Sequence, residues 1–121
     1  MKKYLLLLLL IAAGVYFTRN MDSGKVLRIG VECDYAPNNW EENAQTKTNF
    51  PIVNEPGHYA EGYDLQIAKL VADELHMKLE VRKIAWNDLQ DALNRGEIDA
   101  IFSGMLDSPE RRKKSAFSDV Y

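Results

Sequence analysis

The chain begins with two lysines and a long apolar run. Lys2 and Lys3 precede fourteen residues without a charge, 4–17, in which leucine is the most frequent residue. This order of positive charge and hydrophobicity is typical of an export signal. As a helix the run would extend ~21 Å at ~1.5 Å per residue, less than the ~30 Å hydrocarbon core of a bilayer. Small residues at 12–14 would place cleavage early, so a cleaved signal, a retained membrane anchor and a buried core helix all stay open.

After a polar linker, hydrophobic residues recur with helical spacing. Residues 63–76 carry apolar side chains on one face, and Asp64 is the expected N-cap of this helix. Residues 86–95 form a second predicted helix, which Gly96 would end as a C-terminal cap. A short third helix is expected to begin at Ser108, because a proline follows it at the first helical position.

Three strands are predicted around these helices. Residues 27–31 form the first strand. Residues 77–81 alternate between apolar and polar, which is typical of a half-exposed edge strand, whereas the apolar run 98–102 suits an interior strand. The alternation of strands and helices predicts an α/β fold with a mostly parallel sheet. Residues 34–61 show neither the helical spacing nor the strand alternation of apolar residues. They are expected to form a long loop, and a loop of this length is often functional.

Composition narrows the function classes. The 121 residues provide room for one domain or less, and a net charge of -3 argues against nucleic acid as a partner. The single cysteine excludes an intramolecular disulfide and zinc sites built on cysteine pairs. The histidines, His58 and His76, lie far apart and show no metal-ligand spacing. No nucleophile constellation or phosphate loop is present, so neither catalysis nor a cofactor or metal is predicted.

Polar residues follow two of the predicted strands. Glu32 and Tyr35 come after the first strand, and Ser103 and Gly104 come after the apolar one. Because ligands of open parallel sheets bind at the carboxyl ends of strands, these residues are candidates for a binding site. Arg111 near a helix N-terminus suits an anion such as a carboxylate, although the basic run that it begins is, as a whole, more typical of a solvated face.

Several motifs resemble those of family 3 extracellular solute-binding proteins, the polar amino-acid receptors of ABC importers. Residues 62–68, Gly-Tyr-Asp-Leu-Gln-Ile-Ala, are similar to the helix signature of this family. Further similar segments follow in the family's order at 29–37, 96–101, 103–111 and 117–121. The resemblance covers essentially everything after residue 25. It implies a periplasmic-binding-protein-like (type II) lobe, with a mostly parallel sheet and helices on both faces.

The resemblance also implies a domain organisation. Residues 1–24 would be a signal peptide or an N-terminal membrane anchor plus a linker, and residues 25–121 would be the first lobe of a two-lobed solute-binding domain. Receptors of this kind enclose an amino acid between two lobes by hinge closure. Because the chain reaches only the expected transition between lobes, the first lobe is expected to be incomplete and the second to be absent.

By this resemblance, six residues would bind the amino acid. Arg111 would clamp the α-carboxylate through its planar guanidinium, and the Gly104 backbone would line the same subsite. Ser103 would accept a hydrogen bond from the α-ammonium. Tyr35 and Trp86 would flank the ligand side chain as aromatic walls, although Trp86 could instead be simple core packing.

Glu32 is the sixth of these residues. It matches an acidic position that in this family often recognises a polar or cationic ligand side chain. A hydrogen-bonded structural carboxylate at a strand end is the alternative role for Glu32. The resemblance therefore favours a polar or cationic amino acid as the ligand.

The chain departs from the family pattern in three places. Leu106 stands where a serine or threonine usually contacts the ligand, so one hydrogen bond would be lost or supplied elsewhere. Gln66 replaces the usual acidic residue of the helix signature, which is a scaffold position. The segment 34–61 is longer than common, and Trp40 or Phe50 within it could cover the pocket.

The expected function is non-catalytic amino-acid binding outside the cytoplasm, in the periplasm or at the cell surface. The partners would be ABC permease subunits, with the membrane reached through the signal or anchor, and the truncated lobe is not expected to be competent alone. Two alternatives remain. One is an enzyme similar to the periplasmic dehydratases of cyclohexadienyl acids, and the other is the ligand-sensing domain of a membrane-anchored receptor.

Overall fold

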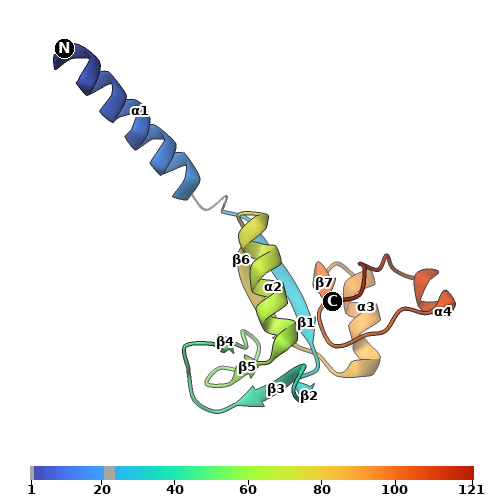
Figure 1. Cartoon of the computed structure of the whole chain (residues 1–121). Coiled ribbons are helices and arrows are strands. Elements are labelled where there is room, and N and C mark those ends of the chain that lie inside the picture. Colours follow the sequence, from blue (N-terminus) through green and yellow to red (C-terminus); the bar gives the residue numbers. More distant parts are fainter. Residues whose placement is uncertain (1, 21–23) are drawn as a thin grey trace.

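The computed structural model describes residues 2–20 and 24–121 (Figure 1). The first described segment is the helix α1, Lys2–Asn20, and its side chains from 4 to 13 are exposed. No helix in these described ranges combines the length and apolar character needed to cross a membrane. Met1 and residues 21–23, which belong to the predicted signal and linker, lie outside the described residues. The assignment of residues 1–24 as a signal or an anchor stays a prediction.

The central sheet is parallel and contains three strands. Its order is β6 (Lys78–Lys83), β1 (Val26–Val31) and β7 (Ala100–Ile101). β1 pairs with β6 along its whole length and with β7 at Ile29 and Gly30. The predicted parallel pairing and the edge position of the alternating strand are confirmed.

The prediction that the apolar run 98–102 lies inside the sheet is wrong within the described residues. Only Ala100 and Ile101 form a strand, and they pair with β1 alone. β1 is the interior strand instead. The run is apolar because Ile98, 1% exposed, packs on the face of the sheet, so that its burial does not require a strand on either side.

The two longer helices of the lobe cover opposite faces of this sheet. Leu27, Ile29 and Val31 belong to one buried cluster with Leu65, Ala68 and Ala72 of α2 (Tyr63–Glu74). A Cβ added to Gly30 would instead meet Ile98 and Leu89, the first residue of α3 (Leu89–Asn94). Because successive residues of a strand point to opposite faces, α2 and α3 lie on different sides of β1. This confirms the expected layering of the lobe.

Residues 34–61 are not a structureless loop, and this prediction is wrong. They form a four-stranded antiparallel sheet in the order β2 (Asp34–Tyr35), β3 (Asn39–Glu42), β5 (Tyr59–Glu61) and β4 (Phe50–Pro51). Strands of two to four residues are too short to display a period of two, and the pairing of β3 with β5 joins residues that are distant in sequence. The backbone N–H of Val53 donates to Val81 O at 2.9 Å, which joins this sheet to β6.

The N-cap of α2 also differs from the prediction. The cap residue is Gly62, and no side chain caps the helix. The backbone carbonyls of Pro37 and Asn38 accept hydrogen bonds from the first N–H groups of α2, at 3.2 and 2.9 Å. Asp64 lies inside the first turn and is 2% exposed, so its carboxylate is available for a buried hydrogen-bond network rather than for capping.

The end of α3 and the start of α4 (Pro109–Arg112) follow the sequence, but the α-helix predicted over 86–95 begins only at Leu89. A single 3-10 turn, Trp86–Asp88, precedes α3, and Gly96 ends that helix with a φ of 73°. The hydrogen bond from Glu97 N to Ala92 O, 3.0 Å, completes the C-terminal cap. α4 begins as predicted, because Ser108 Oγ accepts a hydrogen bond from the backbone of Arg111 at 3.2 Å.

Candidate functional site

The ends of β1 and β7 are tied together by Glu32 and Ser103. The backbone N–H of Glu32 donates to Ser103 Oγ at 2.9 Å, and Ser103 is 2% exposed. Phe102 N donates to Gly30 O at 3.1 Å one step earlier along the same edge. The two residues that sequence reasoning placed at strand ends are therefore neighbours, and the Ser103 hydroxyl has a structural partner in addition to its predicted role toward an ammonium group.

Tyr35 lies against the backbone of Gly104. The φ of Gly104 is 62°, and a Cβ at this position would lie 3.0 Å from Tyr35 Cε1. Glycine thus meets both a backbone and a packing requirement here. Both residues line a pocket of about 260 Å³ together with Asn38, Phe117 and Tyr121. The contact brings together one predicted aromatic wall and one predicted backbone element of the carboxylate subsite.

Arg111 and Trp86 form the third contact among the predicted site residues. The guanidinium carbon lies 5.6 Å from the centroid of the Trp86 ring, in a cation–π arrangement. Arg111 Nη1 also donates to the backbone carbonyl of Leu106 at 2.6 Å. Trp86 is half-buried and is not among the buried core residues, and its role as an aromatic wall toward a ligand stays a prediction.

Leu106, the departure from the family pattern, contributes its backbone. Its side chain is 73% exposed, while its carbonyl oxygen accepts the hydrogen bond from Arg111. A guanidinium has five N–H donors, and this contact uses one nitrogen only. The Leu106 carbonyl therefore orients the guanidinium without exhausting its capacity to bind an anion.

Glu32 lines a different pocket from Tyr35 and Gly104. This pocket has a volume of about 510 Å³, and its lining carries three carboxylates and one ammonium. The full lining is Glu32, Cys33, Asp34, Trp40, Glu41 and Lys83. Burial raises the pKa of the Cys33 thiol to about 12, so Cys33 adds no negative charge at neutral pH. The excess of carboxylates makes this pocket suited to a cation.

Ser103 borders a third pocket, also of about 510 Å³, which shares Phe117 and Tyr121 with the pocket of Tyr35. The six predicted residues thus meet as three contacting pairs and do not form one enclosed cavity. The pairs are Glu32 with Ser103, Tyr35 with Gly104, and Trp86 with Arg111.

Sequence reasoning missed a buried network that supports Tyr35. Asn39 is fully buried, accepts a hydrogen bond from Cys33 N at 2.9 Å and donates to Asp64 Oδ2 at 2.8 Å. The Tyr121 hydroxyl donates to the other carboxylate oxygen of Asp64 at 2.5 Å. This network holds the turn between β1 and β3, on which Tyr35 lies. Nothing in the local sequence distinguishes a buried asparagine from one in an exposed turn, so only the burial of Asn39 identifies it.

The architecture defines the class of the protein: an α/β lobe of the type II periplasmic amino-acid-binding fold, in which Glu32 and Ser103 follow the carboxyl ends of the parallel strands β1 and β7. Residues 27–121 match the bacterial extracellular solute-binding proteins, family 3, and the chain belongs to this family.

Two curated relatives illustrate the range of the family. The chain is 33% identical to the arginine-binding extracellular protein ArtP of Bacillus subtilis (strain 168) over 128 aligned positions, which cover 100% of this chain and 45% of ArtP. It is 31% identical to the cyclohexadienyl dehydratase of Pseudomonas aeruginosa over 103 positions, 85% of this chain and 33% of the enzyme. The chain thus spans less than half the length of these relatives.

Solved structures agree with the assignment of the fold. The Phe57Trp mutant of the arginine-bound form of domain 1 from TmArgBP is 31% identical in sequence and superposes with a TM-score of 0.61. The superposition covers 79% of this chain and 64% of that domain. At this level of identity, the similarity extends to the sequence as well as to the fold.

Proposed function

We propose that residues 25–121 form the first ligand-binding lobe of an exported amino-acid receptor that serves an ABC importer. Residues 1–24 would be the export signal or membrane anchor, and permease subunits would be the membrane partners. The observation that carries the proposal is the guanidinium of Arg111, which rests on Trp86 and is oriented by Leu106 O. The family membership supports the same function.

Arg111 is the proposed anchor for the α-carboxylate of the ligand. A planar guanidinium can donate two parallel hydrogen bonds to one carboxylate, which a lysine ammonium cannot do with the same geometry. The face of Trp86 and the carbonyl of Leu106 restrict the rotation of the guanidinium, so less conformational entropy is lost when the ligand binds. The backbone of Gly104 would complete this subsite.

A cationic amino acid is the proposed ligand. The pocket that contains Glu32 carries three carboxylates and one ammonium, and its charge would favour a cationic side chain. Two relatives, ArtP and TmArgBP domain 1, are described as arginine-binding or arginine-bound. Arginine is therefore the first ligand to test, with lysine and histidine next.

Replacing Glu32 by glutamine is expected to reduce affinity for arginine, lysine and histidine about tenfold, and to change affinity for glutamine much less, because only the cationic side chains lose a charge partner. Calorimetry would use a chimera in which residues 25–121 precede the part of ArtP beyond the matched region. Glu74→Gln, at the exposed end of α2, is the matched control and should leave the whole panel unchanged. An equal loss for all ligands would assign Glu32 a structural role.

The chain by itself is expected to bind free arginine with a dissociation constant in the millimolar range or weaker. A one-sided site leaves ionic contacts exposed to water, where each is worth ~0–1 kcal/mol, while association costs several kcal/mol of lost freedom. Titration followed by NMR would measure this affinity. A micromolar constant would contradict the prediction and show that one lobe suffices, an outcome that the arginine-bound domain 1 of TmArgBP makes worth testing.

The second candidate function is dehydration of a cyclohexadienyl acid. It is favoured by the 31% identity to the Pseudomonas aeruginosa dehydratase across 85% of this chain. Such an enzyme needs a proton donor for the leaving hydroxyl, and Glu32 is the candidate carboxyl group. Formation of an aromatic product by the same chimera, measured by ultraviolet absorbance and abolished in Glu32→Gln, would favour this function over binding.

A further inference from the structure

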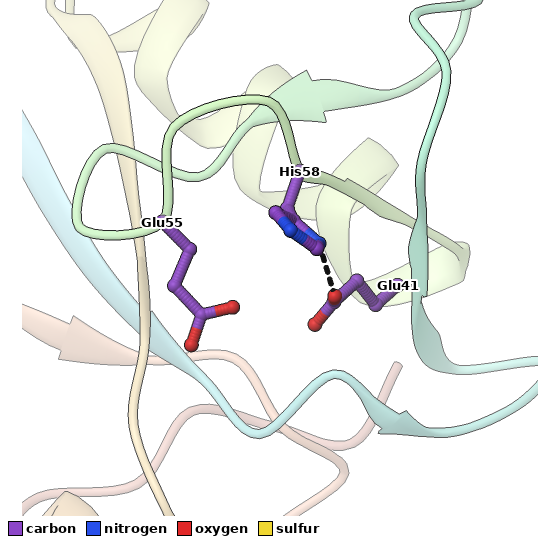
Figure 2. Close-up of side chains that lie close together, drawn as sticks. All are labelled: Glu41, Glu55 and His58. Atoms are coloured by element: carbon purple, nitrogen blue, oxygen red, sulfur yellow. Dashed lines mark hydrogen bonds and ion pairs between the residues drawn. The ribbon is translucent and has the colours of Figure 1, made fainter.

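Glu41, Glu55 and His58 converge on one point beside the antiparallel sheet (Figure 2). Each of them presents one possible metal-ligand atom, and these atoms all lie within 4.8 Å of one another. His58 Nδ1 lies 2.5 Å from Glu41 Oε1. All three residues are half-buried, so their side chains are held near one another but can still be reached from solvent.

The backbone around this cluster is well fixed. Ile52 N donates to His58 O at 2.9 Å, and His58 N donates to Glu55 O at 3.1 Å, which closes the turn that carries two of the three residues. The Asn54 side chain makes two hydrogen bonds, of 2.8 and 2.9 Å, to the backbone of Lys83 in β6. Glu41 comes from β3, which is paired with β5 directly after His58. The three side chains therefore start from a rigid frame.

A protein cation already lies among these carboxylates. Lys83 Nζ contacts Glu41 Oε2, and it lies 3.5 Å from Glu55 Oε2. The hydrogen bonds from Lys83 and then His58 hold the pKa of Glu41 below its ordinary value, so this carboxylate stays ionised at neutral pH. Lys83 thus occupies the position of a counter-ion between two carboxylates.

We propose that Glu41, Glu55 and His58 bind a Zn²⁺ ion, which displaces the Lys83 ammonium from the two carboxylates. Two carboxylate oxygens and one imidazole nitrogen form a donor set that suits zinc, with water in a fourth position. A divalent cation would balance both carboxylates, whereas one ammonium balances only one. The pocket of about 510 Å³ that Glu41 and Lys83 line provides a route for the ion and room for the displaced lysine.

Bound zinc would stabilise the fold by joining two segments of the chain. Zinc would connect β3 to the turn that ends at His58, and so would stabilise the antiparallel sheet against the rest of the lobe. The proposal is argued from the positions of Glu41, Glu55 and His58 and not from amino-acid binding. Glu41 also lines the pocket that contains Glu32, so bound zinc would reduce the negative charge of that pocket. The buried Cys33 thiol, with its raised pKa, is a poor competing ligand.

The test is a titration of the full, untagged 121-residue chain with Zn²⁺ in mild detergent, followed by calorimetry. We expect one ion per chain, and we expect His58→Gln to weaken binding at least tenfold. His76→Gln, which changes the other histidine, is the matched control and should bind as the unmodified chain does. Circular dichroism would check that each variant keeps its fold. The absence of saturable binding, or an equal affinity in His58→Gln, would overturn the proposal.

Lys83→Met supplies a test in the opposite direction. If the lysine competes with zinc for Glu41 and Glu55, its removal should tighten zinc binding several-fold and increase the zinc-dependent rise in melting temperature. A cluster of ordinary ion pairs would lose stability in this variant without gaining zinc affinity. An unchanged or weaker affinity for zinc in folded Lys83→Met would therefore contradict the displacement of Lys83.

Discussion

Replacing Arg111 by lysine is expected to weaken amino-acid binding by about 2–4 kcal/mol, which is about 30- to 1000-fold in dissociation constant. The lysine ammonium keeps the charge but loses the planar pair of donors toward a carboxylate. It also loses the fit over the ring of Trp86 and the hydrogen bond to Leu106 O that orients the guanidinium. Calorimetry with arginine, in the chimera that supplies a second lobe from ArtP, would measure the change.

Arg112 provides a matched control for this substitution. It is the next residue of α4, its side chain is 60% exposed, and it pairs with Asp107. Arg112→Lys should change the affinity less than threefold, because an exposed ion pair contributes little and lies outside the proposed site. A change below threefold for Arg111→Lys as well would show that Arg111 does not hold the ligand carboxylate.

Replacing Gly62 by alanine is expected to lower the free energy of unfolding by about 3 kcal/mol. The φ of Gly62 is 129°, in a region that side chains rarely tolerate, and an added Cβ would lie 2.3 Å from the carbonyl oxygen of Asn38. That oxygen accepts a hydrogen bond from Asp64 N, so it cannot move without releasing the start of α2. Urea unfolding of the full chain, followed by circular dichroism, would measure the loss.

Gly96→Ala separates the destabilisation that comes from a positive φ from the destabilisation that comes from the close contact with Asn38. Gly96 has a φ of 73°, but an added Cβ there would meet no atom within 4 Å. Gly96→Ala should therefore lower the free energy of unfolding by only about 1–2 kcal/mol, which is the cost of placing an alanine at a positive φ. If Gly62→Ala were no more destabilising than Gly96→Ala, the close contact with Asn38 would not be a constraint on the fold.

The sequence predicts those helix ends and strands that depend only on residues close together in the chain. The start of α4 at Ser108 and Pro109 and the end of α3 at Gly96 need only a cap residue and a left-handed glycine. The alternation over 77–81 identifies an edge strand because one face of that strand meets the core and the other meets water. In these places the physical requirement and the residues that meet it lie within one turn or one strand.

The candidate site is predictable in part for the same reason. Strands that run parallel end at one edge, so Glu32 and Ser103 could be expected to meet, and they do. The resemblance to the receptor family placed Trp86 and Arg111 in one site, and the structure brings their side chains into contact. The roles of these residues toward a ligand stay predictions, because they depend on the ligand itself.

By itself, the sequence determined the α/β class, the parallel pairing and the family of this protein, because these follow from periodicity, connection order and local motifs. Only the tertiary structure decided that residues 34–61 pair as an antiparallel sheet, that Asn39 and Asp64 are buried together, and that His58 lies beside two glutamates. Each of these features depends on at least one pair of residues that are distant along the chain, such as Trp40 with Glu61, Asn39 with Asp64 and Glu41 with His58. Such contacts depend on the free energy of the whole packed lobe, and no stretch of sequence carries that information alone.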